Sequence, residues 1–226
     1  MIQDDYKQAA ARESLRNIRG KQLIGIGTGS TVRYLIDEIG KNKNDFSNSF
    51  FVPTSTDTRN RLSENGLNIV EDFVGKAEIS VDGCDEIDPI GNMIKGGGGA
   101  LTREKMVAFS SQEMLIIADT GKSVNKLGKY GVPVEILPFL HQKTLERIGE
   151  YYKVELRENG KFRTDNGNLL ALVHTGLMDK PELVLQQMKN IPGVVEVGIF
   201  IGFASESIIC GENSCIRKKY NKGKKN

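Results

Sequence analysis

Cysteine and histidine are scarce in this chain of 226 residues. It has three cysteines and two histidines, and no histidine lies at a metal-ligand spacing from a cysteine. Cys84, Cys210 and Cys215 form an odd and sparse set, which argues against structural disulfides. His141 and His174 are far apart and have no accompanying serine or cysteine motif. The composition therefore argues against a zinc site, a disulfide scaffold and a histidine-based catalytic triad.

Long apolar runs are also missing. No segment approaches the roughly 18 consecutive apolar residues of a membrane span. The first residues, Met1 to Asp5, do not combine a basic region with an apolar one as a secretory signal does. We therefore expect a cytoplasmic protein that makes no membrane contact.

The net charge is small. The chain carries 31 lysines and arginines against 29 aspartates and glutamates, a formal charge of +2, which is too balanced for nucleic-acid binding through a global field. A basic cluster lies near the C-terminus, at Arg217, Lys218, Lys219, Lys222, Lys224 and Lys225. Because only Tyr220 could serve there as an aromatic platform, this cluster predicts a frayed, solvated terminus. Any anion must be held locally, and no nucleic-acid partner is expected.

The first 129 residues alternate between strand-like and helix-like patterns. Helices are predicted over residues 4–19, 31–40, 57–65 and 99–111, and strands over residues 22–26, 50–53, 67–70, 77–81 and 114–118. Strands that alternate with helices predict an α/β fold: a doubly wound, mostly parallel, Rossmann-like sheet with helices on both faces.

After residue 129 the pattern becomes richer in strands. Helices are predicted over residues 142–151 and 181–189, a hairpin-like segment over 153–165, and strands over 169–174, 194–200 and 207–210. This pattern predicts a second, smaller α+β domain of the ferredoxin-like type over residues 130–203. It would be inserted before the chain returns to the main sheet, so that the Rossmann-like catalytic domain comprises residues 1–129 and 204–226.

The first candidate site is the segment Gly25-Ile26-Gly27-Thr28-Gly29-Ser30-Thr31, between a predicted strand and a predicted helix. Glycine N–H groups, a helix N-terminus and hydroxyl donors together suit a phosphate. The spacing is not that of a nucleotide-binding motif, because Ser30 stands where G-x-G-x-x-G has its third glycine. The alternative is a tight turn in which Ser30 or Thr31 caps the helix.

The second candidate site is acidic. The segment Asp82-Gly83-Cys84-Asp85-Glu86-Ile87-Asp88 follows an apolar strand, and the carboxyl end of a strand is where doubly wound sheets bind ligands. Carboxylates there can accept hydrogen bonds from sugar hydroxyls or move protons. Two alternatives stay open on composition alone: local turn bonds and a divalent-cation site.

The third candidate site combines Lys95, the glycines Gly96 to Gly99, and Glu104. Successive glycines cost conformational entropy, so a chain that keeps four of them before a helix needs its backbone to approach something closely. Their N–H groups and Lys95 could surround a developing negative charge, with Glu104 facing the same crevice. Taken alone, the spacing favours an exposed Glu104 that pairs with a neighbouring lysine or arginine.

Two lysines are further candidates for pairing with a phosphate. Lys7 lies on the first predicted helix and Lys122 in a loop that follows a predicted strand. For a lone lysine, a solvated surface position is the commoner outcome.

Together these motifs resemble those of the A-type ribose-5-phosphate isomerase family. G-x-G-T-G-S-T, D-G-x-D-E-I and K-G-G-G-x-A-L-T-R-E-K occur in the family's order, and the similarity extends from Gln3 to about Gly211. It includes Ala118-Asp119 with Lys122, Leu127-Gly128, and the segments 132–135, 164–168 and 191–195.

The resemblance implies an aldose-ketose isomerase of the non-oxidative pentose phosphate pathway. Such an enzyme interconverts D-ribose 5-phosphate and D-ribulose 5-phosphate through an enediolate, without metal or cofactor, as a homodimer or higher homo-oligomer. It implies catalytic roles for Glu104, as proton acceptor, and for Asp82, Asp85 and Lys95. It implies substrate binding by Lys7, Thr28, Gly29, Ser30, Thr31, Gly83, Cys84, Gly96, Gly97, Gly98 and Lys122.

The chain departs from the family pattern at three positions. Cys84 and Gly99 replace a commoner alanine and keep the residue small, whereas Ala171 stands where an aspartate often occurs. Ala171 falls in the predicted small domain, away from the proposed pocket, so its replacement is expected to bear mainly on oligomer or interdomain contacts.

Other functions are weighed against the isomerase. A coenzyme A transferase and an amino-sugar-phosphate deaminase would use a related sheet. A sugar-phosphate-sensing repressor needs a DNA-binding unit, and only about twenty residues precede the first predicted strand, too few for a helix-turn-helix and a linker. A module that only binds anions would leave Glu104 without a role.

Overall fold

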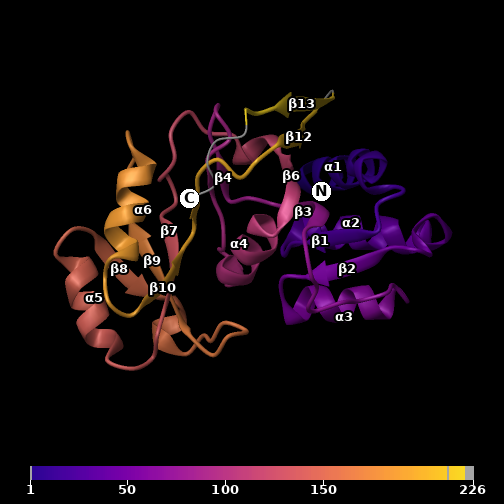
Figure 1. Ribbon diagram of the computed structural model, residues 1–226. Helices are drawn as coiled ribbons and strands as arrows, with labels where there is room; N and C mark the ends of the chain where they lie inside the picture. Colours follow the sequence, from indigo (N-terminus) through magenta and orange to yellow (C-terminus); the bar gives the residue numbers. More distant parts are fainter. Residues whose placement is uncertain (1, 213, 222–226) are drawn as a thin grey trace.

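A six-stranded sheet forms the centre of the computed structural model, which describes residues 2–212 and 214–221 (Figure 1). The strands run in the order β13-β12-β6-β3-β1-β2. Their bounds are β1 Leu23–Ile26, β2 Phe50–Pro53, β3 Ala77–Asp82, β6 Ser111–Asp119, β12 Glu206–Cys210 and β13 Cys215–Lys219. Neighbouring strands are parallel except β12 and β13, which are antiparallel. The predicted mostly parallel sheet is confirmed.

Helices cover both faces of this sheet because its strands alternate their side chains between two apolar layers. The helices are α1 Ile2–Ile18, α2 Ser30–Lys41, α3 Thr56–Glu64 and α4 Leu101–Phe109. Ile24 and Ile26 of β1 lie in one core cluster with Leu35 of α2. Gly25, between them, faces Val107 of α4 instead. The sheet is therefore doubly wound, as the sequence predicts.

A second sheet has four antiparallel strands in the order β10-β7-β9-β8. Its elements are β7 Val132–Ile136, α5 His141–Gly149, β8 Lys153–Leu156, β9 Leu169–His174, α6 Pro181–Lys189 and β10 Val194–Val197. The chain order βαββαβ is that of the ferredoxin-like motif. The fold class is confirmed, whereas the domain boundaries at residues 129/130 and 203/204 stay a prediction.

A three-stranded sheet, in the order β11-β5-β4, joins these two parts. It consists of β4 Glu86–Ile87, β5 Met93–Ile94 and β11 Ile199–Phe200. Gly198 lies at the junction: its carbonyl accepts a hydrogen bond from the Lys95 N–H at 2.9 Å, and its N–H donates to the carbonyl of Pro133 at 2.7 Å. A side chain on Gly198 would collide with both backbones. This close approach fixes Lys95 relative to β7 of the second sheet.

Three sequence predictions of secondary structure are wrong in detail. Residues 67–70 make only one isolated bridge, between Ile69 and Phe51, and not a strand. The predicted strand 194–200 is two strands in different sheets, because the close contacts of Gly198 divide it. The segment 153–165 is not a hairpin. Instead β8 pairs with β9, and a 3-10 helix, Arg157–Gly160, begins the connection between them.

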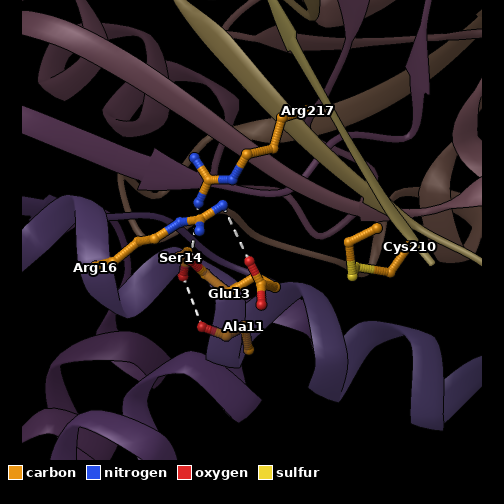
Figure 2. Close-up of a disulfide and its surroundings, with 7 residues drawn as sticks. Ala11, Glu13, Ser14, Arg16, Cys210 and Arg217 are labelled. Carbon is orange, nitrogen blue, oxygen red and sulfur yellow. Dashed lines mark hydrogen bonds and ion pairs between the residues drawn. A yellow bond between two sulfur atoms is a disulfide. The ribbon is translucent and has the colours of Figure 1, made fainter.

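The prediction of a frayed C-terminus is wrong for the basic residues that the structure describes. Arg217, Lys218 and Lys219 lie in β13, which pairs with β12. The Arg217 guanidinium donates to the Glu206 carboxylate at 2.6 Å, and to the carbonyl of Glu13 and the side chain of Asn17, both at 2.9 Å. Figure 2 shows Arg217 reaching from its strand to α1. Lys222, Lys224 and Lys225 lie outside the described residues.

The prediction from the cysteine count that the chain has no disulfide is also wrong. Cys210 and Cys215 are joined by a disulfide between β12 and β13. The antiparallel register places these two residues opposite each other, so the pairing follows from the hairpin, which the sequence analysis did not predict. Cys84 is free.

No helix within residues 2–212 and 214–221 is both long enough and apolar enough to cross a membrane.

Replacing Arg217 by methionine is expected to lower the free energy of unfolding by about 1–2 kcal/mol, because the guanidinium hydrogen bonds link β13 to α1 and β12. Urea denaturation measures the difference. Lys219→Met, which changes an exposed lysine of the same strand, is the control and should remain within about 0.5 kcal/mol of the parent. Equal losses in both variants would show that the contacts of Arg217 do not anchor β13.

Candidate active site

The three predicted motifs converge at the carboxyl end of the main sheet. Strands β1 and β3 are parallel neighbours, so the segments that follow Ile26 and Val81 lie side by side. The glycine run between β5 and α4 completes a cavity of about 100 Å³. Its lining comprises Thr28, Gly29, Ser30, Thr31, Val32, Gly83, Cys84, Asp85, Lys95, Gly96, Gly97, Gly98, Glu104 and Lys122. Thus all the predicted site residues line it except Asp82 and Lys7.

Asp82 lies directly behind this lining and is only 2% exposed. Its Oδ1 accepts hydrogen bonds from the backbone N–H groups of Thr28 at 3.2 Å and Gly83 at 2.7 Å. A side chain at Gly27 would collide with the Asp82 carboxylate. The second glycine of the first motif is therefore needed for the close approach of β1 to this carboxylate.

Lys95 is the cation of the site and is 2% exposed. Its Nζ lies 2.9 Å from Asp82 Oδ2 and 3.4 Å from Glu104 Oε2, and it donates to the carbonyl of Gly83 at 2.6 Å. Burial alone would lower the pKa of Lys95, but the charges of Asp82 and Glu104 outweigh it and raise the pKa above its ordinary value. Lys95 is therefore a permanently charged ammonium group.

Glu104 lies in the first turn of α4, is 4% exposed, and faces the cavity. Burial raises the pKa of its carboxyl to about 8, and the charge of Asp82 adds to this effect while Lys95 opposes it. Burial likewise raises the pKa of Asp82 despite its pairing with Lys95. Glu104 is thus a buried carboxyl able to gain and lose a proton near neutral pH, not the exposed partner of a surface cation.

The other acidic residues of the second motif divide into two groups. Asp85 lines the cavity, and its Oδ2 accepts a hydrogen bond from the Gly97 N–H at 2.8 Å. Glu86 accepts from the N–H groups of Gly128 and Tyr130, and Asp88 accepts from nearby backbone N–H groups. The alternative in which an acidic side chain only stabilises a local turn therefore applies to Asp88, whereas Asp82 and Asp85 lie at the candidate site.

The first motif presents a helix N-terminus to the cavity. α2 begins at Ser30, its N-cap is Gly29 with φ 132°, and no side chain caps it. The alternative in which Ser30 or Thr31 is the N-cap is therefore wrong. The Thr28 hydroxyl lies 2.8 Å from those of Thr54 and Ser55. This hydroxyl cluster was not predicted, although the hydroxyl residues that follow β2 in the sequence resemble those of the first motif.

Lys122 lines the cavity from the 3-10 helix Thr120–Lys122. Lys7 does not line it, and its Nζ lies 3.1 Å from Asp4 Oδ1, so a role for Lys7 stays a prediction.

Burial raises the pKa of the Cys84 thiol to about 12, which makes this cysteine a small lining side chain and not a nucleophile.

The second sheet also contributes to the site. The Arg157 guanidinium donates to the carbonyl of Gly97 at 2.9 Å, and the ring of Phe162 lies where a side chain on Gly99 would be. A wider cavity of about 540 Å³, lined in part by Ala171, shares Asp85, Gly97 and Lys122 with the smaller one. Arg157 and Phe162 were not predicted as site residues, because they lie about 60 residues after the glycine run and carry no motif of their own.

No group of three or more histidine, cysteine, aspartate or glutamate side chains is arranged to hold a metal ion in the part of the chain that the structure describes. The positive charge beside Asp82 is the ammonium group of Lys95.

Comparisons with known proteins agree on one family. A family model described as ribose 5-phosphate isomerase A (phosphoriboisomerase A) matches residues 50–214. The ribose-5-phosphate isomerase A of Thermoplasma acidophilum is 39% identical over 218 residues, covering 94% of this chain and 90% of the relative. That of Picrophilus torridus is 42% identical over 199 residues, covering 87% and 89%.

Solved structures give the same result. A D-ribose-5-phosphate isomerase in complex with phospho-erythronic acid is similar with a TM-score of 0.92 and 33% identity, covering 97% of this chain and 100% of the other. The ribose 5-phosphate isomerase of Plasmodium falciparum has a TM-score of 0.91 and 31% identity, covering 96% and 99%.

The raised pKa of Glu104 predicts a pH-dependent stability. The unfolded chain releases this proton near its ordinary value of 4.5, whereas the folded protein keeps it to about 8. The unfolded state then binds fewer protons, so this group's contribution to stability falls as pH rises between these values. Glu104→Gln removes the titration. The difference in unfolding free energy, variant minus parent, should therefore increase by a few kcal/mol as the pH rises from 4.5 to 8.5.

Denaturant unfolding at several pH values measures this difference. Glu64→Gln removes an exposed glutamate of α3 and controls for the loss of one carboxylate from the chain. Parallel curves for the parent and Glu104→Gln across the whole range would contradict the raised pKa.

Proposed function

The chain belongs to the ribose 5-phosphate isomerase A family, and we propose on this premise that it interconverts D-ribose 5-phosphate and D-ribulose 5-phosphate. The observation that carries the proposal is the placement of Glu104. This buried carboxyl, with a pKa of about 8, faces a cavity that is also lined by Lys95 and by the glycines Gly96 to Gly98.

The reaction needs one base that serves two carbons. In the open-chain aldose, the proton on C2 is acidic because it lies next to the carbonyl at C1. Glu104 as carboxylate removes this proton, and the electron pair of the C2–H bond forms the enediolate. The same carboxyl then returns the proton to C1, while O1 gains a proton and O2 loses one. The sum is an isomerisation with no external oxidant or reductant.

Lys95 and the glycine N–H groups would stabilise the charge that develops on O1 and O2. The ammonium group is held in place by Asp82 and the Gly83 carbonyl, so it needs no reorganisation during the reaction. Asp85, which accepts a hydrogen bond from the Gly97 N–H, would accept hydroxyl protons and assist ring opening. Asp82, which lies behind the cavity lining, would instead hold Lys95 in place and keep it charged.

The remaining predicted residues would bind the substrate. The N-terminus of α2, with Thr28, Ser30 and Thr31, offers N–H and hydroxyl donors to a phosphate, and Lys122 and Lys7 would add positive charge. Gly83 and Cys84 would border the sugar, and their small size keeps the pocket open. A similar structure was solved in complex with phospho-erythronic acid, which supports a phosphorylated ligand for this family.

Three further statements belong to the same proposal. The enzyme would act in the non-oxidative pentose phosphate pathway, in the cytoplasm, and as a homodimer or higher homo-oligomer. A transferase or an amino-sugar-phosphate deaminase would need a different substrate, so one assay separates them.

The purified chain should convert ribose 5-phosphate to ribulose 5-phosphate in the presence of a chelator, and should act far less on arabinose 5-phosphate and glucosamine 6-phosphate. Glu104→Gln should lose at least about 100-fold in kcat, because it removes the base and keeps its shape. Calorimetric binding of ribose 5-phosphate should persist in this variant. Near-parental turnover by Glu104→Gln, with Glu64→Gln as matched control, would refute the role of Glu104.

The activity should also depend on pH in a stated direction. The base must be ionised in the free enzyme, so kcat/KM should rise with pH and level off above about 8, the pKa of Glu104. A steady-state pH profile checks this expectation. A profile that is already flat between pH 6 and 9 would contradict it.

A further inference from the structure

The Glu104 carboxylate is held weakly by its own contacts. Its Oε2 is a buried atom without a hydrogen bond within the described structure, and its nearest cation, Lys95 Nζ, is 3.4 Å away. The position of this base therefore depends on the backbone of α4. The first turn of α4 has no side-chain cap at Ala100, so other contacts must fix it.

Thr102, two residues before Glu104, provides one such contact. Its hydroxyl donates to Oε2 of Glu135, a residue of β7 in the second sheet that is 0% exposed. Oε1 of Glu135 accepts from the side chains of Thr164 at 2.8 Å, Asn166 at 3.1 Å and Asn168 at 2.8 Å. Both carboxylate oxygens are thus occupied by neutral donors.

Arg103, the residue directly before Glu104, provides the second contact. Its Nε donates to the Asn166 side chain at 2.8 Å and its Nη2 to the carbonyl of Asp165 at 2.9 Å. The Asp165 carboxylate accepts in turn from the N–H of Thr56, at the start of α3, at 2.7 Å. The segment 164–168 therefore links the first turn of α4 to Glu135 and to the main domain's α3.

A carboxylate suits this place for two reasons. It has only acceptor sites, so two oxygens can receive all four donors without a donor of its own left unpaired. Its negative charge also lies beside the N-terminal turn of α4, where the helix dipole favours an anion. The segments 132–135 and 164–168, which the sequence analysis matched to the family without a role, meet at this carboxylate.

We propose that Glu135 and the segment 164–168 are positioning residues that fix Glu104 over the substrate, acting through Thr102 and Arg103. The inference rests on the proposed isomerase function and adds a task for the second sheet: it holds the catalytic helix. Proton transfer needs the base at hydrogen-bond distance from the reacting carbon, and a displacement of about 1 Å can cost about 100-fold in rate.

The network should act on turnover and not on binding. The segments proposed to hold the phosphate are residues 28–31, in the turn after β1 and the start of α2, and Lys122, in the 3-10 helix after β6. The hydrogen bonds of Glu135 go to Thr102, Thr164, Asn166 and Asn168, and not to these segments. A shift of the first turn of α4 would therefore lower kcat and leave KM nearly unchanged.

Thr102→Val and Thr102→Ser form the matched test pair. Valine keeps the shape and removes the hydroxyl, whereas serine keeps the hydroxyl. We expect Thr102→Val to lose about 10-fold in kcat with KM within about 2-fold of the parent, and Thr102→Ser to stay within about 3-fold of the parent kcat. Arg103→Met, at a partly exposed position, should lose kcat in the same way. Met106→Gln, on the exposed side of α4, should match the parent.

A second measurement needs no turnover. NMR titration of the Glu104 side-chain carboxyl, labelled with ¹³C, should give a changed pKa in Thr102→Val and the parental pKa in Thr102→Ser, because the pKa depends on where the carboxyl lies between Asp82 and Lys95. Circular dichroism confirms that each variant is folded at the assay temperature.

The outcomes separate the two claims. A parental kcat and a parental titration in Thr102→Val would overturn the positioning role, as would a loss confined to KM or an equal loss in the valine and serine variants. If the parent enzyme does not convert ribose 5-phosphate, the proposed function fails, and the titration still decides whether the network positions Glu104.

Discussion

A buried lysine between two buried carboxylates is the constraint on which the rest of the structure depends. An ammonium group out of water is costly unless anions and hydrogen-bond acceptors surround it, and Lys95 has Asp82, Glu104 and the Gly83 carbonyl around it. These groups come from β3, α4 and the turn after β3, so all of them must meet at one point. Two glycines allow these groups to come this close. Gly27 allows β1 to approach the Asp82 carboxylate, and Gly198 allows a second backbone to fix Lys95.

The two larger sheets meet around α4. Figure 1 shows this helix between the main sheet and the four-stranded sheet, and it contacts β3 and β6 on one side and β7 and β10 on the other. The buried Lys105 of α4 extends the connection by donating to the carbonyls of Val197 and Ile199. A carboxyl carried by a helix between two sheets is held by packing from both, and so needs fewer hydrogen bonds of its own. This leaves the Glu104 carboxyl available for proton transfer while its location stays defined.

Much of the fold could be predicted because the signals are local. The strand at 50–53, the strand at 169–174 and the helix at 181–189 have the predicted bounds, since apolar periodicity and flanking glycine or proline define them. The predictions fail where contacts distant in sequence decide. Gly198 divides one expected strand because two backbones approach it, and the C-terminal basic segment becomes β13 because β12 and α1 offer it partners. The cysteine count likewise gave no sign that a hairpin would bring Cys210 opposite Cys215.

The sequence by itself determined the alternation of strands and helices, the three motifs and their order, and through their combination the family. It also determined which residue types were available for proton transfer and anion binding. Only the tertiary structure decided which of those residues are buried together and which groups they contact. Spacing alone favours an exposed Glu104, whereas burial beside Asp82 raises its pKa to about 8. The role proposed for Glu135 likewise depends on donors about 30 residues away on either side. The physical reason is that a carboxyl's protonation and position are set by the dielectric, charges and donors around it, which are assembled from distant parts of the chain.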